Sequence, residues 1–327
     1  MAGFSDVIGH GSIIDRLKSS VTSDRVSHAY IFSGPDGCGK MMMAKAFAAA
    51  LNCDEGDGDA CGVCMSCMQA ETDNHPDIIV VKKSKSVVSV DDIRSQLIND
   101  IEVRPYNGRY KVYIIDEAEK MGEPAQNALL KTLEEPPAYA IIILLTSSVE
   151  RFLPTIMSRS VLLTFNPLPF EVVAKRLTDR FAASRDEAMF LAAYSCGNIG
   201  LAEAAFLSPD FKDRSLELIS FLSDAKSLDM GDVNIMAAKL SAKEYPYSDA
   251  LRLMELWFRD LLLFKSSHAS DRLVFLKFLS EIERLSEYYS FSELSDILSE
   301  IAFSSKKINS NVNKELVFEL LLIKMVK

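Results

Sequence analysis

The sequence contains no hydrophobic run long enough to cross a membrane. Its longest run, Ala140–Leu145, is as long as a strand and falls well short of the roughly 18 residues that a membrane helix needs. Residues 1–12 also lack the basic start and apolar stretch that are typical of an export signal. We therefore expect a cytoplasmic protein without a membrane partner.

Positive charge is also scarce, because 36 Lys and Arg residues stand against 46 Asp and Glu residues, a formal net charge of −10. Proteins that grip duplex DNA by themselves need the opposite balance, since phosphate contacts supply much of their affinity. This argues against autonomous DNA binding. Hydrophobic residues make up 48% and charged residues 25% of the chain, which is typical of a folded globular protein. We find no repeat of solenoid period.

The 327 residues predict two domains, or three if one is small. Residues 1–166 alternate short apolar strands with helical patterns, which is typical of a parallel α/β domain covered on both faces. The expected strands are His28–Ser33, Asp77–Val81, Lys111–Asp116, Ala140–Thr146 and Val161–Phe165. Residues 167–209 predict a small helical domain with helices Phe170–Phe181, Arg185–Tyr194 and Leu201–Leu207, interrupted by a turn at Cys196-Gly197-Asn198.

Residues 210–327 predict an all-helical third domain. Its longer expected helices include Ser248–Lys265, Asp271–Tyr289, Phe291–Phe303 and Val312–Val326. In the last of these, Leu316, Leu320 and Ile323 recur at helical spacing, with Val317, Leu321 and Met325 widening the stripe. Such a stripe is more often internal core than a surface that faces another subunit. Both readings stay open at this point.

The strongest local motif is Gly34-Pro35-Asp36-Gly37-Cys38-Gly39-Lys40-Met41, between an expected strand and the helical run Met42–Leu51. Strand, glycine-rich loop and helix together form a phosphate cradle. Gly34, Gly37 and Gly39 let backbone N–H groups converge on phosphate oxygens, and Lys40 can reach the terminal phosphates. The alternative is a tight turn without nucleotide.

Met41 departs from this motif, which normally ends in Ser or Thr with a hydroxyl that binds Mg²⁺. A thioether cannot replace that ligand, because Mg²⁺ prefers oxygen. We therefore expect weak binding of ATP or ADP at most.

Three further segments become candidate functional residues because this loop is present. Asp116 and Glu117 end an apolar strand about 75 residues after it, where an Asp can lie near Mg²⁺ and a Glu can polarise water. Thr146 ends the next expected strand and could bond a phosphate or water, although such threonines often only cap a strand edge. Arg159, in Ser158-Arg159-Ser160, precedes the last strand. The simplest interpretation is that its side chain forms an ion pair on the surface.

Four of the six cysteines form the cluster Cys53-x7-Cys61-x2-Cys64-x2-Cys67. In a reducing compartment this clustering favours metal over disulfides, and four thiolates can surround Zn²⁺ tetrahedrally. Because no position is left for water, the zinc should be structural. Reduced free cysteines or a redox pair are the alternatives. Cys38 and Cys196 lie outside the spacing of this cluster, and we assign them no function.

Taken together, these motifs resemble bacterial clamp-loader subunits of the AAA+ ATPase superfamily, along all three expected domains. Asn127–Pro137, which reads Asn-Ala-Leu-Leu-Lys-Thr-Leu-Glu-Glu-Pro-Pro, is the most specific segment. The other segments that carry the resemblance are Val7-Ile8-Gly9, residues 27–34 (SHAYIFSG), the four cysteines, His75-Pro76-Asp77, residues 108–117 (GRYKVYIIDE) and Asn311-Val312-Asn313.

The resemblance implies an AAA+ nucleotide-binding domain with a zinc module at about 53–67, a helical lid and a C-terminal helical collar that joins subunits. It adds Val7 and Ile8 to the expected nucleotide site. It also implies that Arg159 is an arginine finger, acting in trans on the ATP site of a neighbouring subunit. The implied partners are gamma/tau-type and delta-type loader subunits, with the sliding clamp and primer-template DNA contacted through the assembly.

Within that family, the departures resemble a delta-prime-type subunit. Met41 replaces the hydroxyl residue, and Gly200 stands where motor subunits carry the lid arginine of a Gly-x-x-Arg segment. The chain also lacks the long tail of the tau form. We expect a DNA polymerase III loader subunit without intrinsic ATPase activity, while intact Lys40, Asp116 and Glu117 keep an ATP-hydrolysing motor subunit as the alternative. An autonomous AAA+ remodeller or helicase is the second alternative.

Overall fold

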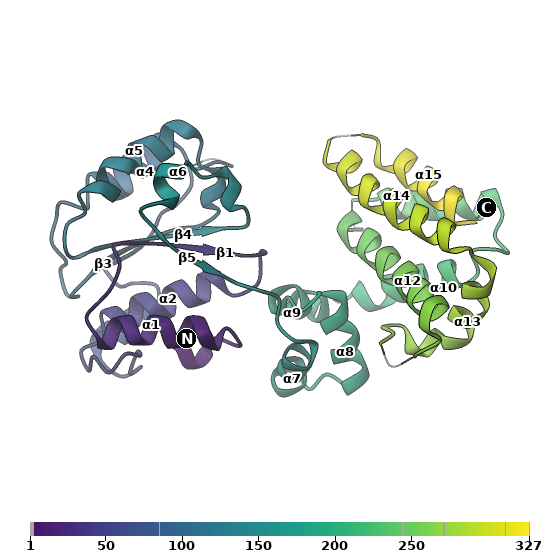
Figure 1. Ribbon diagram of the computed structural model, residues 1–327, viewed down its shortest axis with the longest axis horizontal. Helices are drawn as coiled ribbons and strands as arrows, with labels where there is room; N and C mark the ends of the chain where they lie inside the picture. The colour runs from purple at the N-terminus through teal and green to yellow at the C-terminus, as the bar shows by residue number, and fades with distance from the viewer. Residues whose placement is uncertain (1–2, 85, 244, 271, 311, 327) are drawn as a thin grey trace. The chain divides into compact units, whose positions relative to one another are not determined.

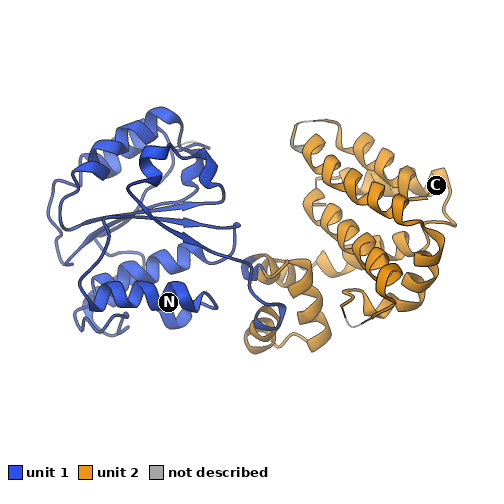
Figure 2. Ribbon diagram, viewed as in Figure 1, with its two compact units in different colours: residues 1–172, 198–200 blue, residues 173–197, 201–327 orange. Residues whose placement is uncertain are grey.

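A computed structural model describes residues 3–84, 86–243, 245–270, 272–310 and 312–326. The chain divides into two compact units (Figure 2). The first runs to Val172 and includes Asn198–Gly200, and the second comprises Val173–Gly197 and the residues from Leu201 onward. Among the described residues, no helix has the length and apolar character needed to span a membrane. The predicted boundaries of three domains stay a prediction.

The first unit contains a five-stranded sheet in the order β2-β3-β4-β1-β5, with every neighbouring pair parallel. The strands are β1 (Ala29–Ser33), β2 (Ile78–Val80), β3 (Lys111–Ile115), β4 (Ala140–Thr146) and β5 (Val161–Thr164). Each corresponds to a predicted strand. Parallel pairing places all five carboxyl ends at one edge of the sheet and all five amino ends at the other.

Helices cover both faces of this sheet (Figure 1). One face carries α1 (Gly11–Thr22) and α2 (Lys40–Leu51), and the other carries α4 (Val90–Ile93), α5 (Glu123–Glu134) and α6 (Pro154–Met157). Shorter elements complete the unit: η1 (Phe4–Asp6), α3 (Met65–Glu71), η2 (Arg94–Ile98), η3 (Ala118–Lys120) and η4 (Val149–Arg151).

Side chains that alternate along β1 build two separate cores. Tyr30 and Phe32 pack with residues of α1 and α2, whereas Ala29 and Ile31 pack with residues of α5 and α6. Because successive side chains point to opposite faces, a strand buried on both faces must be apolar throughout. β4 follows this rule up to its last residue: all seven residues are buried, and the six before Thr146 are apolar.

Among its described residues, the second unit contains helices and loops but no strand. Its helices are α7 (Phe170–Phe181), α8 (Arg185–Tyr194), α9 (Ile199–Leu207), α10 (Phe211–Ser223), α11 (Met230–Ser241), α12 (Tyr247–Ser267), η5 (Leu276–Phe278), α13 (Leu279–Tyr288), α14 (Phe291–Asn309) and α15 (Lys314–Val326). The first residues of α7 and of α9 belong to the first unit. The parallel α/β unit followed by helices confirms the predicted fold class, a parallel-sheet α/β domain with an all-α C-terminal part.

The prediction of one helix over Asp271–Tyr289 is wrong. Asp271 lies outside the described residues, and the α-helix begins only at Leu279. The fully buried carboxylate of Asp260 accepts the backbone N–H groups of Val274 and Phe275, at 2.6 and 3.0 Å, and so holds this segment as a turn. A long-range hydrogen bond therefore overrides the local helical pattern.

The stripe on α15 divides between the core and the surface. Val317, Leu321 and Met325 are buried, whereas Leu316 and Leu320 are 49% and 55% exposed. Core packing is therefore confirmed for one side of the helix, and the surface that would face another subunit stays a prediction for the exposed side.

Candidate nucleotide site and cysteine cluster

The glycine-rich loop connects the carboxyl end of β1 to the start of α2, as predicted. Gly37 and Gly39 have φ of 82° and 96°, the left-handed region that glycine adopts without strain. Gly39 is the N-cap of α2, and Lys40 is its first residue. The N–H groups of the loop and of the first helical turn therefore lie where an anion would bind.

Lys40 points back into its own loop. Its Nζ donates to the carbonyl oxygens of Gly34 and Pro35 at 2.5 and 2.9 Å, and lies 3.5 Å from Oδ1 of Asp36. The side chain is only 7% exposed. The three donors of the ammonium group are thus directed to groups of this chain.

Residues 198–200 lie directly on this loop. The side chain of Asn198 donates to the carbonyl oxygen of Asp36, and the backbone N–H of Gly200 donates to that of Gly37 at 3.0 Å. A Cβ atom at Gly200 would lie 2.7 Å from the Gly37 oxygen, so only glycine fits without displacement. Sequence reasoning noted Gly200 as a missing arginine but did not foresee this contact. The pair Gly197 and Gly200 was the available signal.

Met41 is partly buried and packs against the core beneath α1 and α2. Its side chain is part of the hydrophobic packing and brings no oxygen to the loop. This placement agrees with the loss of the hydroxyl ligand that the sequence indicates.

The acidic pair lies after β3, as predicted. Asp116 accepts the backbone N–H of Glu117 at 2.9 Å. Glu117 has a φ of 50° and forms ion pairs with Lys83 and Lys120, the latter at 2.6 Å. Sequence reasoning missed Lys83, which lies 34 residues away and belongs to no motif. Two lysines of its own chain thus engage this carboxylate.

Thr146 is 1% exposed at the carboxyl end of β4. Its Oγ1 donates to the carbonyl oxygen of Ser148 and accepts the Ser148 N–H, both at 3.0 Å. Its own carbonyl oxygen accepts the N–H of Gly34 at 3.0 Å. Thr146 therefore lies beside the glycine-rich loop, with its hydroxyl committed to the next turn.

Val7 and Ile8 occupy the segment between η1 and α1. Val7 is buried in the core beneath α2, and Ile8 is half-buried. The next residues touch the loop itself, because Nε2 of His10 lies 3.1 Å from the carbonyl oxygen of Cys38. The sequence offered no signal for His10 beyond its place after Val7-Ile8-Gly9.

Arg159 lies at the opposite edge of the sheet from the loop. It precedes the amino end of β5, while Gly34 follows the carboxyl end of the parallel neighbour β1. Its guanidinium pairs with Glu134 at 3.0 Å and donates to the carbonyl oxygen of Thr155 at 3.1 Å. Its side chain is 36% exposed. The structure thus separates Arg159 from the other predicted site residues of this chain.

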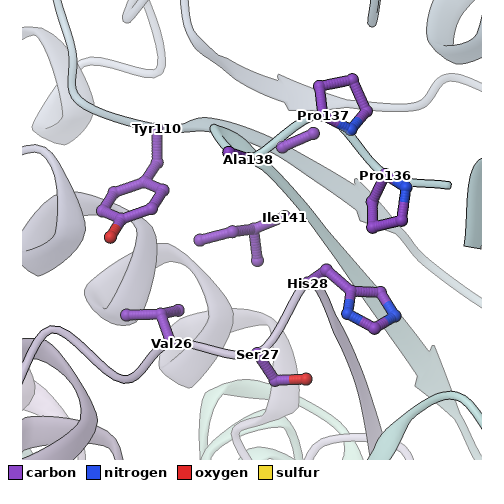
Figure 3. A pocket seen from close by; sticks show the side chains of 9 residues that line it. Val26, Ser27, His28, Tyr110, Pro136, Pro137, Ala138 and Ile141 are labelled. Atoms are coloured by element: carbon purple, nitrogen blue, oxygen red, sulfur yellow. The ribbon is translucent and has the colours of Figure 1, made fainter.

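A hollow of about 240 Å³ opens at the same edge as Arg159. Figure 3 shows the side chain of Ile141 between Tyr110 and Pro136, with Val26 below Tyr110. Nε2 of His28, which also lines the hollow, has no hydrogen-bond partner among the described residues. The lining includes both prolines of the segment Asn127–Pro137.

The four clustered cysteines come together between α2 and β2. One sulfur from each of Cys53, Cys61, Cys64 and Cys67 lies within 4.8 Å of the other three. Tetrahedral zinc with Zn–S distances of ~2.3 Å requires sulfurs about 3.8 Å apart. The 3.9 Å between the Cys61 and Cys67 sulfurs matches that requirement.

Backbone N–H groups surround these sulfurs. Cys64 donates to the Cys61 sulfur at 3.3 Å, and Cys67 donates to the Cys64 sulfur at 3.4 Å. Hydrogen bonds from Val63 and Cys64 lower the pKa of Cys61 to about 7, whereas burial raises the pKa of Cys67. The donor set and its spacing fit a structural Zn²⁺ ion. Cys38 is buried and Cys196 is exposed, and neither belongs to the cluster.

His75 connects the cysteine cluster to the sheet. Its Nδ1 accepts the backbone N–H of Asp77 at 3.0 Å, so Nε2 carries the proton toward Ser66 Oγ, 3.0 Å away. Burial lowers the pKa of His75 and so favours this neutral form. The fully buried Asp77 in turn accepts N–H groups from residues 106–108. These bonds fix the orientation of α3 against the start of β2.

Comparisons with known proteins show which family the chain matches. Residues 9–169 match the family described as "DNA polymerase III, delta subunit", and residues 209–327 match "DNA polymerase III, delta subunit, C terminal". The tau/gamma subunit of Haemophilus influenzae DNA polymerase III is 41% identical over 157 residues, which are 48% of this chain and 22% of the relative.

The tau subunit of Bacillus subtilis DNA polymerase III is 28% identical over 98% of this chain and 61% of its own length. The chain thus spans between about a fifth and three fifths of the length of these relatives. Among solved structures, a gamma subunit-related protein of Thermotoga maritima aligns over 96% of this chain and 98% of its own, with 20% identity and a TM-score of 0.38. On the two family matches and these relatives, the chain belongs to the DNA polymerase III clamp-loader subunits.

Proposed function

We propose that this chain is the delta-prime-type subunit of a DNA polymerase III clamp loader. In this role it does not hydrolyse ATP. It serves as a rigid AAA+ partner against which ATP-driven subunits move, and it supplies Arg159 to a neighbour while the assembly places the sliding clamp on primed DNA.

The observation that carries this proposal is that the glycine-rich loop is engaged by its own chain. Lys40 donates to the carbonyl oxygens of Gly34 and Pro35, and Gly200 packs on Gly37. A nucleotide must displace these contacts before its phosphates can bind. Met41 then offers no oxygen to Mg²⁺, so a bound phosphate would lack the usual metal bridge. Weak ATP or ADP binding without turnover follows.

Glu117 supports the same conclusion. A carboxylate that orients attacking water should be free to accept a proton or a hydrogen bond. Here Lys83 and Lys120 both pair with it. The acidic residue has the expected position, but its charge is already neutralised.

Arg159 gives the subunit a role in a reaction that it does not perform itself. Because Arg159 and the loop lie at opposite edges of one sheet, Arg159 serves a nucleotide bound by another subunit. A guanidinium placed in trans can stabilise the charge that develops on the transferred phosphoryl group. The hollow beside Pro136 and Pro137 belongs to the same edge, which we assign to that neighbour.

The partners in this proposal are gamma/tau-type and delta-type subunits, joined through the C-terminal helices. Exposed apolar side chains on α11, α14 and α15 supply a surface for this contact: Ile235, Phe303, Leu316 and Leu320. The sliding clamp and primer-template DNA are reached through the assembly. Structural Zn²⁺, held by Cys53, Cys61, Cys64 and Cys67, supports the fold of the module between α2 and β2.

The second candidate is an ATP-hydrolysing gamma/tau-type motor subunit of the same loader. Lys40, Asp116 and Glu117 favour it, as does the similarity to tau and gamma subunits. Steady-state ATPase measurement on the purified, isolated chain separates the two. The delta-prime-type role predicts no turnover above that of a Lys40→Ala control, whereas turnover that Lys40→Ala abolishes would establish the motor role.

A further inference from the structure

The module between α2 and β2 exposes a set of apolar side chains. Val63, Met65 and Met68, which we call the module face, are 75%, 63% and 45% exposed. Met65 and Met68 are three residues apart on α3 and therefore lie on the same side of that helix. Val63 precedes them in the turn between Cys61 and Cys64. Single exposed apolar residues are common on protein surfaces, but three large ones within six positions form a cluster that calls for an explanation.

The hydrogen bonds of the module fix this exposure. Cys64 caps α3 by accepting the Cys67 N–H, and Ser66 contacts the buried His75 at 3.0 Å. Ser66 and Cys67 are 4% and 0% exposed, so the inward side of α3 is already occupied. Met65 and Met68 cannot turn toward the core without breaking these contacts.

The surroundings of the module face are acidic. Residues 53–74 contain no Lys, Arg or His, and their acidic residues are Asp54, Glu55, Asp57, Asp59, Glu71 and Asp73. Asp59 pairs with Lys18 at 2.8 Å and Asp73 with Lys45 at 2.6 Å. This charge repels phosphate, so it disfavours nucleic acid and anionic lipid as occupants. It attracts a cationic partner.

We propose that the module face is a docking site for a basic amphipathic helix of a partner protein. The apolar side of that helix packs on Val63, Met65 and Met68, while Lys or Arg residues beside it pair with the acidic residues of the module. Methionine suits this contact, because its flexible thioether adapts to different apolar surfaces. The proposal is independent of whether the chain hydrolyses ATP.

The test uses a fluorescent 16-residue peptide with Leu at helical spacing and Lys at the other positions, titrated with the full chain. The double variant Met65→Ser, Met68→Ser should weaken binding at least tenfold. Val87→Ser and Val103→Ser are matched controls, since these valines are 48% and 44% exposed elsewhere in the same unit, and they should leave binding unchanged. Equal metal content and equal thermal unfolding would show that the double variant keeps the module folded.

Charge and self-association complete the test. A peptide with Glu in place of Lys should not bind, and added salt should weaken the Lys peptide. Equal binding by the double variant, or equal binding of the Glu peptide, would overturn the proposal. Sedimentation that shows a dimer of the wild-type chain, lost in the double variant, would overturn it in favour of a second copy as the occupant.

Discussion

The guanidinium of Arg159 lies 3.0 Å from the carboxylate of Glu134 and so binds within its own subunit. Glu134 is the last residue of α5, and Arg159 follows α6. Their side chains are 51% and 36% exposed, and an exposed ion pair contributes only about 0–1 kcal/mol. In the role that we propose, Arg159 can therefore leave Glu134 at little cost to reach the nucleotide of a neighbouring subunit.

Glu134→Gln tests whether this ion pair is a resting position. The free energy of unfolding should change by less than about 1 kcal/mol, and the ATPase rate of a reconstituted loader should rise by no more than about fivefold. Urea unfolding and steady-state ATPase measurement check the two values. If the ATPase rate instead falls as far as with Arg159→Ala, then Glu134 positions the arginine in the working assembly.

Gly200→Ala tests the contact between residues 198–200 and the glycine-rich loop. The added Cβ meets the Gly37 oxygen at 2.7 Å, so we expect destabilisation of about 1–3 kcal/mol in urea unfolding. Gly11→Ala is the matched control, because it also lies at a helix start and has no atom within 4 Å of the added Cβ. Equal stabilities of the two variants would show that residues 198–200 do not pack on the loop in solution.

Metal content tests the cysteine cluster. Reduced protein purified without chelator should contain about one zinc per chain. Cys64→Ser should lose most of it, because it removes one of the four sulfurs, while serine can still cap the N-terminus of α3. Cys196→Ser should keep it, since this exposed cysteine lies outside the cluster. Zinc below about a tenth of an equivalent in the wild-type protein would exclude the site.

Asp77 makes stability depend on pH. Burial raises the pKa of this carboxyl, but hydrogen bonds from the N–H groups of residues 106–108 outweigh it and hold the pKa below its ordinary value. A folded pKa below the unfolded one stabilises the fold above the unfolded pKa of about 4. That stability is lost as the pH falls through the folded pKa.

Asp77→Asn should therefore lower stability at pH 7 and flatten the loss of stability below pH ~4. Urea unfolding across this pH range measures both effects. Glu55→Gln, at an exposed position of the neighbouring module, is the control and should leave the pH profile unchanged. A parallel pH profile for Asp77→Asn and the wild-type chain would contradict this role of the carboxylate.

Elements whose local pattern agrees with their packing could be predicted closely from the sequence. β4, Ala140–Thr146, matches its prediction at both ends because every residue is apolar or buried at the sheet centre. α7 and α8 also match at both ends. The failure at Asp271–Tyr289 comes from Asp260, a charged residue on another helix whose hydrogen bonds no local pattern reveals.

The same distinction applies to the candidate site. Contiguous motifs located the loop of Lys40, the acidic pair after β3 and the four clustered sulfurs. The pairing of Glu117 with Lys83 and the packing of Gly200 on Gly37 join segments far apart in the chain. Such contacts depend on the tertiary fold and on side-chain orientation, so sequence spacing alone could not predict them.

The most direct test of the proposed role is the clamp- and DNA-stimulated ATPase rate of a loader in which this subunit alone carries Lys40→Ala or Arg159→Ala. An arginine finger contributes roughly 10³–10⁵ in rate at the site it serves, but a loader has several sites, so losing one finger removes part of the total. We predict that Arg159→Ala lowers the rate and Lys40→Ala does not, while both variants assemble. A loader slowed by Lys40→Ala and unaffected by Arg159→Ala would contradict the proposal and identify the chain as a motor subunit.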